Sequence, residues 1–126
     1  MKIASLIARL LLGLVFLLFG LNGFLHFIPM PPPSGVAGQF FAAIIASPYW
    51  TIIFGVQVIG GVLMLVGRFV PLALVILGPV IVNIISFHAF MAPAGLPLAL
   101  VVTALWVVVA IRNKQHLAGL FVAKSE

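Results

Sequence analysis

Four long apolar stretches alternate with short breaks along the chain. They cover residues 3–27, 49–65, 70–90 and 96–111, and they are followed by a short polar tail, 112–126. Each apolar stretch is close to the ~20 residues that an α-helix needs to cross the ~30 Å hydrocarbon core of a bilayer. The pattern therefore predicts four transmembrane helices in a single integral membrane domain, 1–126.

The break between the first and second stretches contains a further predicted element. Residues 29–33 read Pro-Met-Pro-Pro-Pro, which is incompatible with a helix because proline lacks a backbone donor and clashes with the preceding turn. Ser34 or Gly35 can then cap a short helix that runs through Ala46. This helix carries no charge and is too short to cross a bilayer. The predicted fold class is all-α: a four-helix transmembrane bundle with a short interfacial or re-entrant helix between the first and second spans.

The composition indicates that this chain is surrounded by lipid and not by water. Hydrophobic residues make up 65% and charged residues 6%, and the mean hydropathy is +1.43. Soluble domains carry about 25% charged residues, so this chain is predicted to be an integral membrane protein. The first stretch is too long for the apolar region of a signal peptide. The absence of cysteine excludes disulfides, thiolate metal sites and iron–sulfur ligation.

The net charge of +5 comes from scattered residues and not from a basic run, which argues against a nucleic-acid partner. The connection between the second and third stretches contains Arg68, whereas the connections at 28–48 and 91–95 hold no Lys or Arg. With four spans, all the cations therefore fall on one side of the membrane. By the positive-inside rule that side is the cytoplasm, and both termini are predicted to be cytoplasmic. The six cations are Lys2, Arg9, Arg68, Arg112, Lys114 and Lys124.

Polar side chains interrupt the spans mainly in the half away from the cations. Asn22 and His26 lie near the end of the first stretch, four residues apart, so on a helix they share one face. Gln57 lies near the middle of the second stretch, and Asn83 and His88 lie in the third. Ionisable residues within spans are functional candidates by default.

Phenylalanines are frequent around these polar positions, namely Phe19, Phe24, Phe27, Phe40, Phe41, Phe87 and Phe90. Polar groups within aromatic walls, beneath the proline-rich loop and its short helix, predict a pocket for a small, mostly apolar ligand. The predicted ligand-binding residues are Asn22, His26, Gln57, Asn83, His88, Phe19 and Phe87.

Simpler interpretations stay open for the same residues. The amides can hold helices together, because amide hydrogen bonds between membrane helices contribute roughly 1 kcal/mol. The histidines can reach headgroup water. Asn83 and His88 are five residues apart, roughly 140° around an ideal helix, so they share a pocket only if the helix is distorted after Pro79.

Two glycines in the first stretch predict a close contact between helices and not a functional site. Gly13 and Gly20 lie on one face of the first predicted helix, opposite Asn22 and His26. Small residues allow helix backbones in a membrane to approach closely, so this face is predicted to pack against a neighbouring helix.

The candidate residues favour some ligands over others. His26 and His88, without a carboxylate or thiolate, make a poor zinc site, and haem held by two histidines is a weaker alternative. A quinone fits better, because its carbonyls need one or two donors in an aromatic slot. The only acidic residue is Glu126, so no intramembrane carboxylate can relay protons. We therefore predict no catalytic residue and no metal ligand, and whether the chain is part of an enzyme stays open.

Four blocks of sequence together resemble a known family. They are Gly-Leu-Asn-Gly-Phe at the end of 9–24, Pro-Met-Pro-Pro-Pro at 29–33, Gln-Val-Ile-Gly-Gly at the start of 57–68, and Asn-Ile-Ile-Ser-Phe-His at 83–88, followed by a Pro-Ala-Gly turn. In their order and spacing they are similar to the DoxX family of small four-span membrane proteins.

This resemblance implies a four-span fold, a place in the bacterial inner (plasma) membrane and a link to quinone chemistry. The family takes its name from a subunit of a terminal quinol oxidase or thiosulfate:quinone oxidoreductase system, and many bacterial members are associated with redox or stress-response complexes. Members commonly carry an acidic residue in the second span where this chain has Gln57. The departure favours binding or assembly over catalysis.

Two functions are therefore predicted. The first is a small subunit of a quinone-linked membrane redox or stress-response complex, which binds a quinone or lipid-like ligand. The alternative is a non-catalytic assembly or chaperone-like partner that uses its polar residues to pair with another membrane protein or with a second copy of itself.

Overall fold

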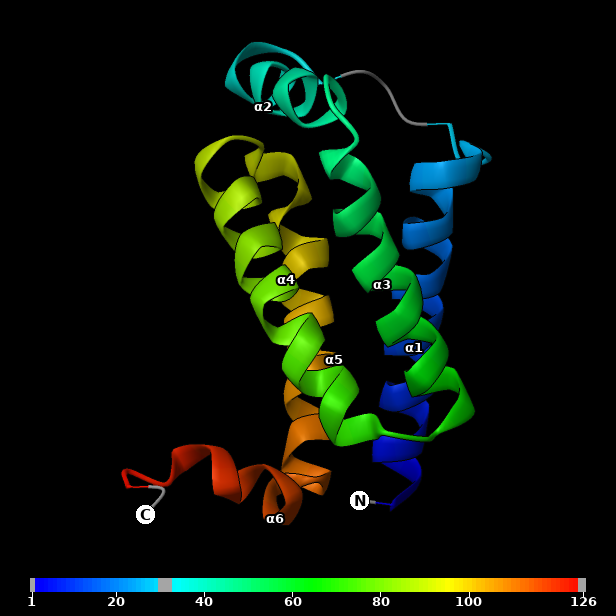
Figure 1. Cartoon of the computed structure of the whole chain (residues 1–126), viewed down its shortest axis with the longest axis vertical. Coiled ribbons are helices and arrows are strands. Elements are labelled where there is room, and N and C mark those ends of the chain that lie inside the picture. The colour runs from blue at the N-terminus through cyan, green and yellow to red at the C-terminus, as the bar shows by residue number, and fades with distance from the viewer. Residues whose placement is uncertain (1, 30–32, 125–126) are drawn as a thin grey trace.

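The computed structural model describes residues 2–29 and 33–124, and these residues contain helices and no strand (Figure 1). The prediction of an all-α fold, with four long apolar helices and a shorter one between the first two, is confirmed. The elements in chain order are α1 (Lys2–Leu25), α2 (Gly35–Ile45), α3 (Tyr49–Val66), α4 (Val70–Phe90), η1 (Pro93–Gly95), α5 (Leu96–Arg112), α6 (Lys114–Leu117) and η2 (Ala118–Phe121).

The long helices form an up-and-down bundle. α1 packs against α3 and α5, and α4 packs against the same two helices, so the spatial order around the bundle is α1, α3, α4, α5. Both ends of the chain lie at one end of this bundle, and α2 lies across the other end (Figure 1). We call the end with the termini the basic end, because Lys2, Arg68 and Arg112 lie there, and the end covered by α2 the aromatic end.

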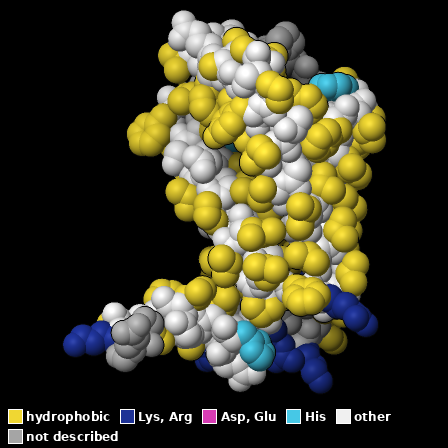
Figure 2. Space-filling view, viewed as in Figure 1, with side chains coloured by type: hydrophobic (Ala, Val, Ile, Leu, Met, Phe, Trp, Pro, Cys, Tyr) yellow, Lys and Arg dark blue, Asp and Glu magenta, His cyan; other side chains and the backbone are white. Residues whose placement is uncertain are grey.

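The surface of the bundle is apolar between its two ends. Figure 2 shows hydrophobic side chains over the long helices, with Lys and Arg gathered at the basic end. A surface of this kind is adapted to lipid. All four long helices have the length and composition to cross a membrane. The largest fully buried side chains form a narrow core along the bundle axis: Leu12, Phe16, Met64, Leu74, Leu77 and Val109.

The contact between α1 and α3 is made by glycines, as predicted for Gly13 and Gly20. A Cβ atom on Gly13 would lie 2.9 Å from the carbonyl oxygen of Gly61, and one on Gly20 would lie 2.9 Å from the backbone nitrogen of Val58. The backbones of the two helices therefore touch directly along this seam, which only glycine allows.

The first helix ends earlier than predicted. The apolar stretch 3–27 suggested a helix through Phe27, but α1 stops at Leu25 and His26 adopts a left-handed conformation with φ 53°. The backbone N–H of His26 donates to the carbonyl oxygen of Asn22 at 2.9 Å, which closes the last turn. His26 therefore lies just beyond the helix, and the prediction that Asn22 and His26 share a helix face is wrong.

Two hydrogen bonds from single side chains join neighbouring helices. Nη1 of Arg9 on α1 donates to the carbonyl oxygen of Met64 near the end of α3. Nε1 of Trp106 on α5 donates to the carbonyl oxygen of Leu74 on α4 at 3.0 Å. Beyond α5, α6 and η2 extend sideways from the basic end (Figure 1).

Candidate ligand site at the aromatic end

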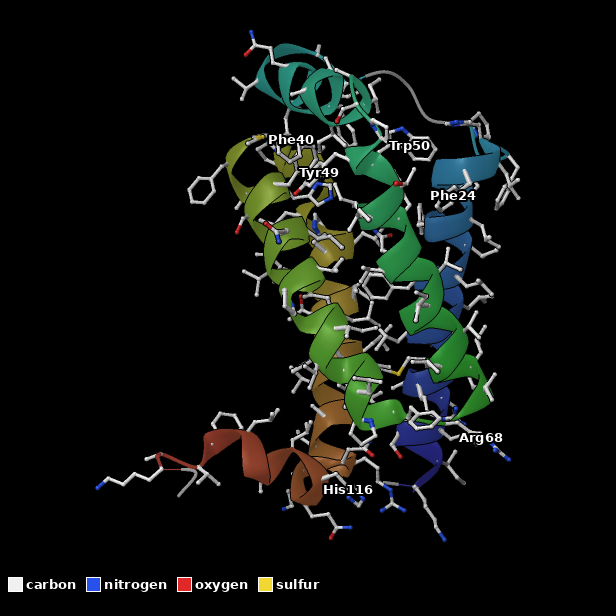
Figure 3. All side chains as sticks on the ribbon, in the orientation of Figure 1. Phe24, Phe40, Tyr49, Trp50, Arg68 and His116 are labelled. Carbon is white, nitrogen blue, oxygen red and sulfur yellow. The ribbon has the colours of Figure 1, made fainter. Side chains whose placement is uncertain are left out.

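Aromatic side chains hold α2 onto the bundle. The ring of Phe87 on α4 lies 5.5 Å from the ring of Phe40 and 5.3 Å from that of Phe41, both on α2. On the other side of this end, Phe24 of α1 lies 5.3 Å from Trp50 of α3 (Figure 3). Ring separations of this size are favourable for aromatic pairs. Four of the phenylalanines that the sequence suggested as pocket walls therefore lie at this end.

His88 faces the interior of the bundle. It lies seven residues after the buried Ile81 and eleven after the buried Leu77, so all three share one face of α4. Its Nδ1 lies 3.2 Å from the carbonyl oxygen of Ala92. Its ring packs on Gly95, where a Cβ atom would come within 2.4 Å of Cε1.

The contact with Ala92 determines what His88 can offer to a ligand. A carbonyl oxygen only accepts, so Nδ1 must carry the proton when this hydrogen bond forms. Nε2 of the neutral ring is then an acceptor. In this arrangement His88 suits a hydroxyl group on a ligand better than a carbonyl group.

Gln57 is the second interior-facing polar residue. It lies about two turns into α3, is 8% exposed, and packs beside α1, where its Cβ is 3.1 Å from the position a Cβ would take on Gly20. Its amide makes no hydrogen bond with the described residues. Among those residues no side-chain nitrogen or oxygen is both fully buried and unpaired, so the amide atoms of Gln57 retain accessible surface. Gln57 therefore presents an accessible donor and acceptor inside the bundle.

Asn22 and His26 serve the end of α1. Oδ1 of Asn22 accepts a hydrogen bond from the backbone N–H of Ile28 at 2.6 Å, which holds the chain as it leaves the helix. His26 is exposed. Asn22 also lies roughly 200° around the helix from Gly20, which contacts α3, so its side chain points away from Gln57.

Asn83 lies on the outer face of α4. It is exposed, and its Nδ2 donates to the carbonyl oxygen of Pro79 at 2.9 Å. The helix continues through Pro79 to Phe90, so Asn83 and His88 do not share a face. Phe19 is half-buried on α1. Of the seven predicted residues, Gln57 and His88 thus face the interior and Phe87 packs beneath α2.

Two grooves lie away from the predicted ligand-binding residues. The larger one, of about 470 Å³, opens at the basic end between α1, α4 and α5. A smaller one, of about 230 Å³, lies between α4, α5 and the tail and has apolar walls that include Trp106 and Phe121. Neither is lined by a predicted ligand-binding residue. The sequence signal for the larger groove is the presence of cations at the span ends, which also predicts the orientation in the membrane.

Comparison with known families settles the classification. The DoxX family profile matches residues 4–89, from the first turn of α1 to the last turn of α4. The chain belongs to the DoxX family. Family membership and the four apolar helices together identify this DoxX protein as a multi-pass membrane protein. No curated protein and no solved structure matches it.

Two polar side chains of this DoxX protein face the interior on the side of the aromatic end. Within 2–29 and 33–124, no three His, Cys, Asp or Glu side chains come close enough together to hold a metal ion. Gln57 offers an amide and His88 offers an imidazole nitrogen, both set among apolar side chains. Such groups can orient the oxygens of an apolar ligand.

Proposed function

We propose that this DoxX protein is a small subunit of a quinone-linked redox or stress-response complex, and that it holds a quinone or lipid-like ligand at its aromatic end. The observation that carries this proposal is the accessible amide of Gln57, which has no hydrogen-bond partner among the described residues. A hydrogen bond from this amide to a ligand oxygen would contribute about 1 kcal/mol to binding.

Each residue has a distinct role in this proposal. The amide NH₂ of Gln57 donates to a carbonyl of the oxidised ligand, and Nε2 of His88 accepts from a hydroxyl of the reduced ligand. The ring of Phe87, held by Phe40 and Phe41, provides an aromatic wall. Because Gln57 stands where a carboxylate would be needed to transfer protons, the chain binds the ligand and leaves the redox chemistry to its partner.

Gln57→Leu is expected to lower the amount of quinone that co-purifies with the protein by about fivefold, because it removes one hydrogen bond worth about 1 kcal/mol. His88→Phe is expected to lower it by a similar factor. The measurement is quinone extraction and quantification, per mole of folded protein, after gentle purification from the native membrane.

Asn83→Leu is the matched control for Gln57→Leu. It also removes an amide from a long helix, but from the outer face of α4. Equal quinone content in Gln57→Leu, Asn83→Leu and the unsubstituted protein would contradict the proposal, as would purification without any quinone or isoprenoid ligand.

The assembly role is the second candidate, and the exposed position of Asn83 favours it. An amide on the lipid-facing surface of a bundle can pair with an amide of another membrane helix. If assembly is the function, Asn83→Leu releases a partner protein or a second copy while Gln57→Leu does not. Cross-linking in membranes followed by mass measurement of the complex separates the two cases.

We also propose that the basic end faces the cytoplasm of a bacterial cell and that the protein resides in the inner membrane. The sequence has no cysteine, so an introduced one is the only thiol. Ser47→Cys, in the turn between α2 and α3, should react with a membrane-impermeant maleimide in intact cells. Gln115→Cys, on α6, should react only after lysis. The reverse labelling pattern would overturn this orientation.

A further inference from the structure

The groove at the basic end combines positive charge with apolar walls. It has a volume of about 470 Å³ and lies where the starts of α1 and α4 meet the end of α5. Lys2, Arg9 and Arg112 line it together with Ile3 and Leu6. Figure 2 shows Lys and Arg side chains gathered at this end. We call this feature the basic groove.

The positive charge of the basic groove is not neutralised by the described part of the chain. The only acidic residue of the sequence, Glu126, lies outside the described residues. One donor of Arg9 is used by the carbonyl oxygen of Met64. Lys2 and Arg112 are exposed, and no hydrogen bond joins their charged groups to residues 2–29 or 33–124. Both are available to an anion in the groove.

The walls indicate that this anion carries a hydrocarbon chain. Ile3 is 74% exposed and Leu6 is 46% exposed, and both lie on the rim of the groove. Their exposed surface continues along α1 onto Leu10 and Leu14, which are also exposed apolar residues. An anion from water would gain nothing from this apolar path, whereas an acyl chain would be covered along its length.

From these observations we propose that the basic groove is a binding site for an anionic phospholipid. The phosphate lies between Lys2 and Arg112, where charge attracts it, and an acyl chain follows Ile3 and Leu6 along α1. A basic pocket between membrane helices at the end of a bundle has the chemistry that anionic headgroups require. The site lies at the opposite end of the bundle from α2 and His88, and it is independent of any quinone.

The test compares two double variants with the same change in charge. Lys2→Gln/Arg112→Gln removes two cations from the groove, and Arg68→Gln/Lys114→Gln removes two from the same end outside it. Native mass spectrometry of the detergent-solubilised protein, titrated with phosphatidylglycerol or phosphatidylcholine, measures bound lipid. Each groove cation contributes about fivefold to phosphatidylglycerol affinity, so the groove variant should bind it about 25-fold more weakly. The control variant should change by less than about threefold.

Several results would overturn the proposal. They are equal binding of phosphatidylglycerol and phosphatidylcholine by the unsubstituted protein, equal losses in the two double variants, and binding of inorganic phosphate alone as tightly as the lipid. Thermal unfolding of both variants checks that they are folded. If the groove variant does not fold, Lys2→Gln alone carries the test, because Lys2 is exposed at the start of α1. An unchanged affinity for phosphatidylglycerol in that variant would then reject the site.

Discussion

Gly61→Ala is expected to separate α1 from α3 and to cause a large loss of folded protein. A Cβ atom at this position would lie 2.6 Å from the backbone nitrogen of Leu17 and 2.8 Å from the carbonyl oxygen of Gly13. Both are backbone atoms, so no side-chain rotation can relieve the contact. Overpacking of a well-packed interior destabilises by roughly 1–3 kcal/mol even where side chains can move, and a backbone clash lies at the upper end of this range or above it.

Gly55→Ala is the matched control, because it lies on the same helix and a Cβ there would meet nothing within 4 Å. Alanine has a higher helix propensity than glycine by about 1 kcal/mol, so this variant should be as stable as the unsubstituted protein or slightly more so. Thermal unfolding in detergent, followed by circular dichroism, measures both. Similar unfolding temperatures for Gly61→Ala and the unsubstituted protein would show that α1 and α3 do not pack as described.

The helices could be predicted because their determinants are local. Long apolar stretches identified the four long helices, and the proline-rich break followed by Ser34 and Gly35 identified α2. The glycine seam was also predictable, because Gly13 and Gly20 fall on one helix face. The end of α1 was not, because hydropathy stays high through Phe27. There the decisive interactions are hydrogen bonds of Asn22, whose side chain and backbone carbonyl accept from two residues beyond the helix.

The site was only partly predictable because the rotation of each helix depends on packing. The sequence defines the angle between Asn83 and His88 but not which of them faces the core. Leu77 decides this for α4, since its side chain fills the space beside Gly60, where a Cβ would lie 2.6 Å from Cδ2. With Leu77 inward, His88 is roughly 20° from it around the helix, and Asn83 is roughly 120° away and faces outward.

The position of the Arg9 side chain also depends on packing. A long cationic side chain in a span usually extends toward the interface. The structure directs it instead across to α3, where its guanidinium lies against Gly67 and donates to the carbonyl oxygen of Met64. The last carbonyls of a helix lack intrahelical partners and carry partial negative charge, so a cation is stabilising there.

Arg9→Met is expected to destabilise the bundle by about 2 kcal/mol. It keeps a long apolar stem but removes a hydrogen bond from a charged donor, which contributes about 1.5–3 kcal/mol, and it leaves the end of α3 without a compensating cation. The measurement is thermal unfolding in detergent from which lipid has been removed, so that lipid binding in the basic groove does not contribute.

Arg9→Lys and Arg68→Gln are the controls for this prediction. Lysine retains the charge on a flexible stem without the planar fork of arginine, so Arg9→Lys should recover part of the lost stability. Arg68 is exposed in the α3–α4 loop, and its substitution should change stability by less than about 0.5 kcal/mol. If Arg9→Met unfolds at the same temperature as Arg68→Gln, the bond to Met64 does not stabilise the bundle. In that case Arg9 contributes positive charge to the basic end but does not stabilise the fold.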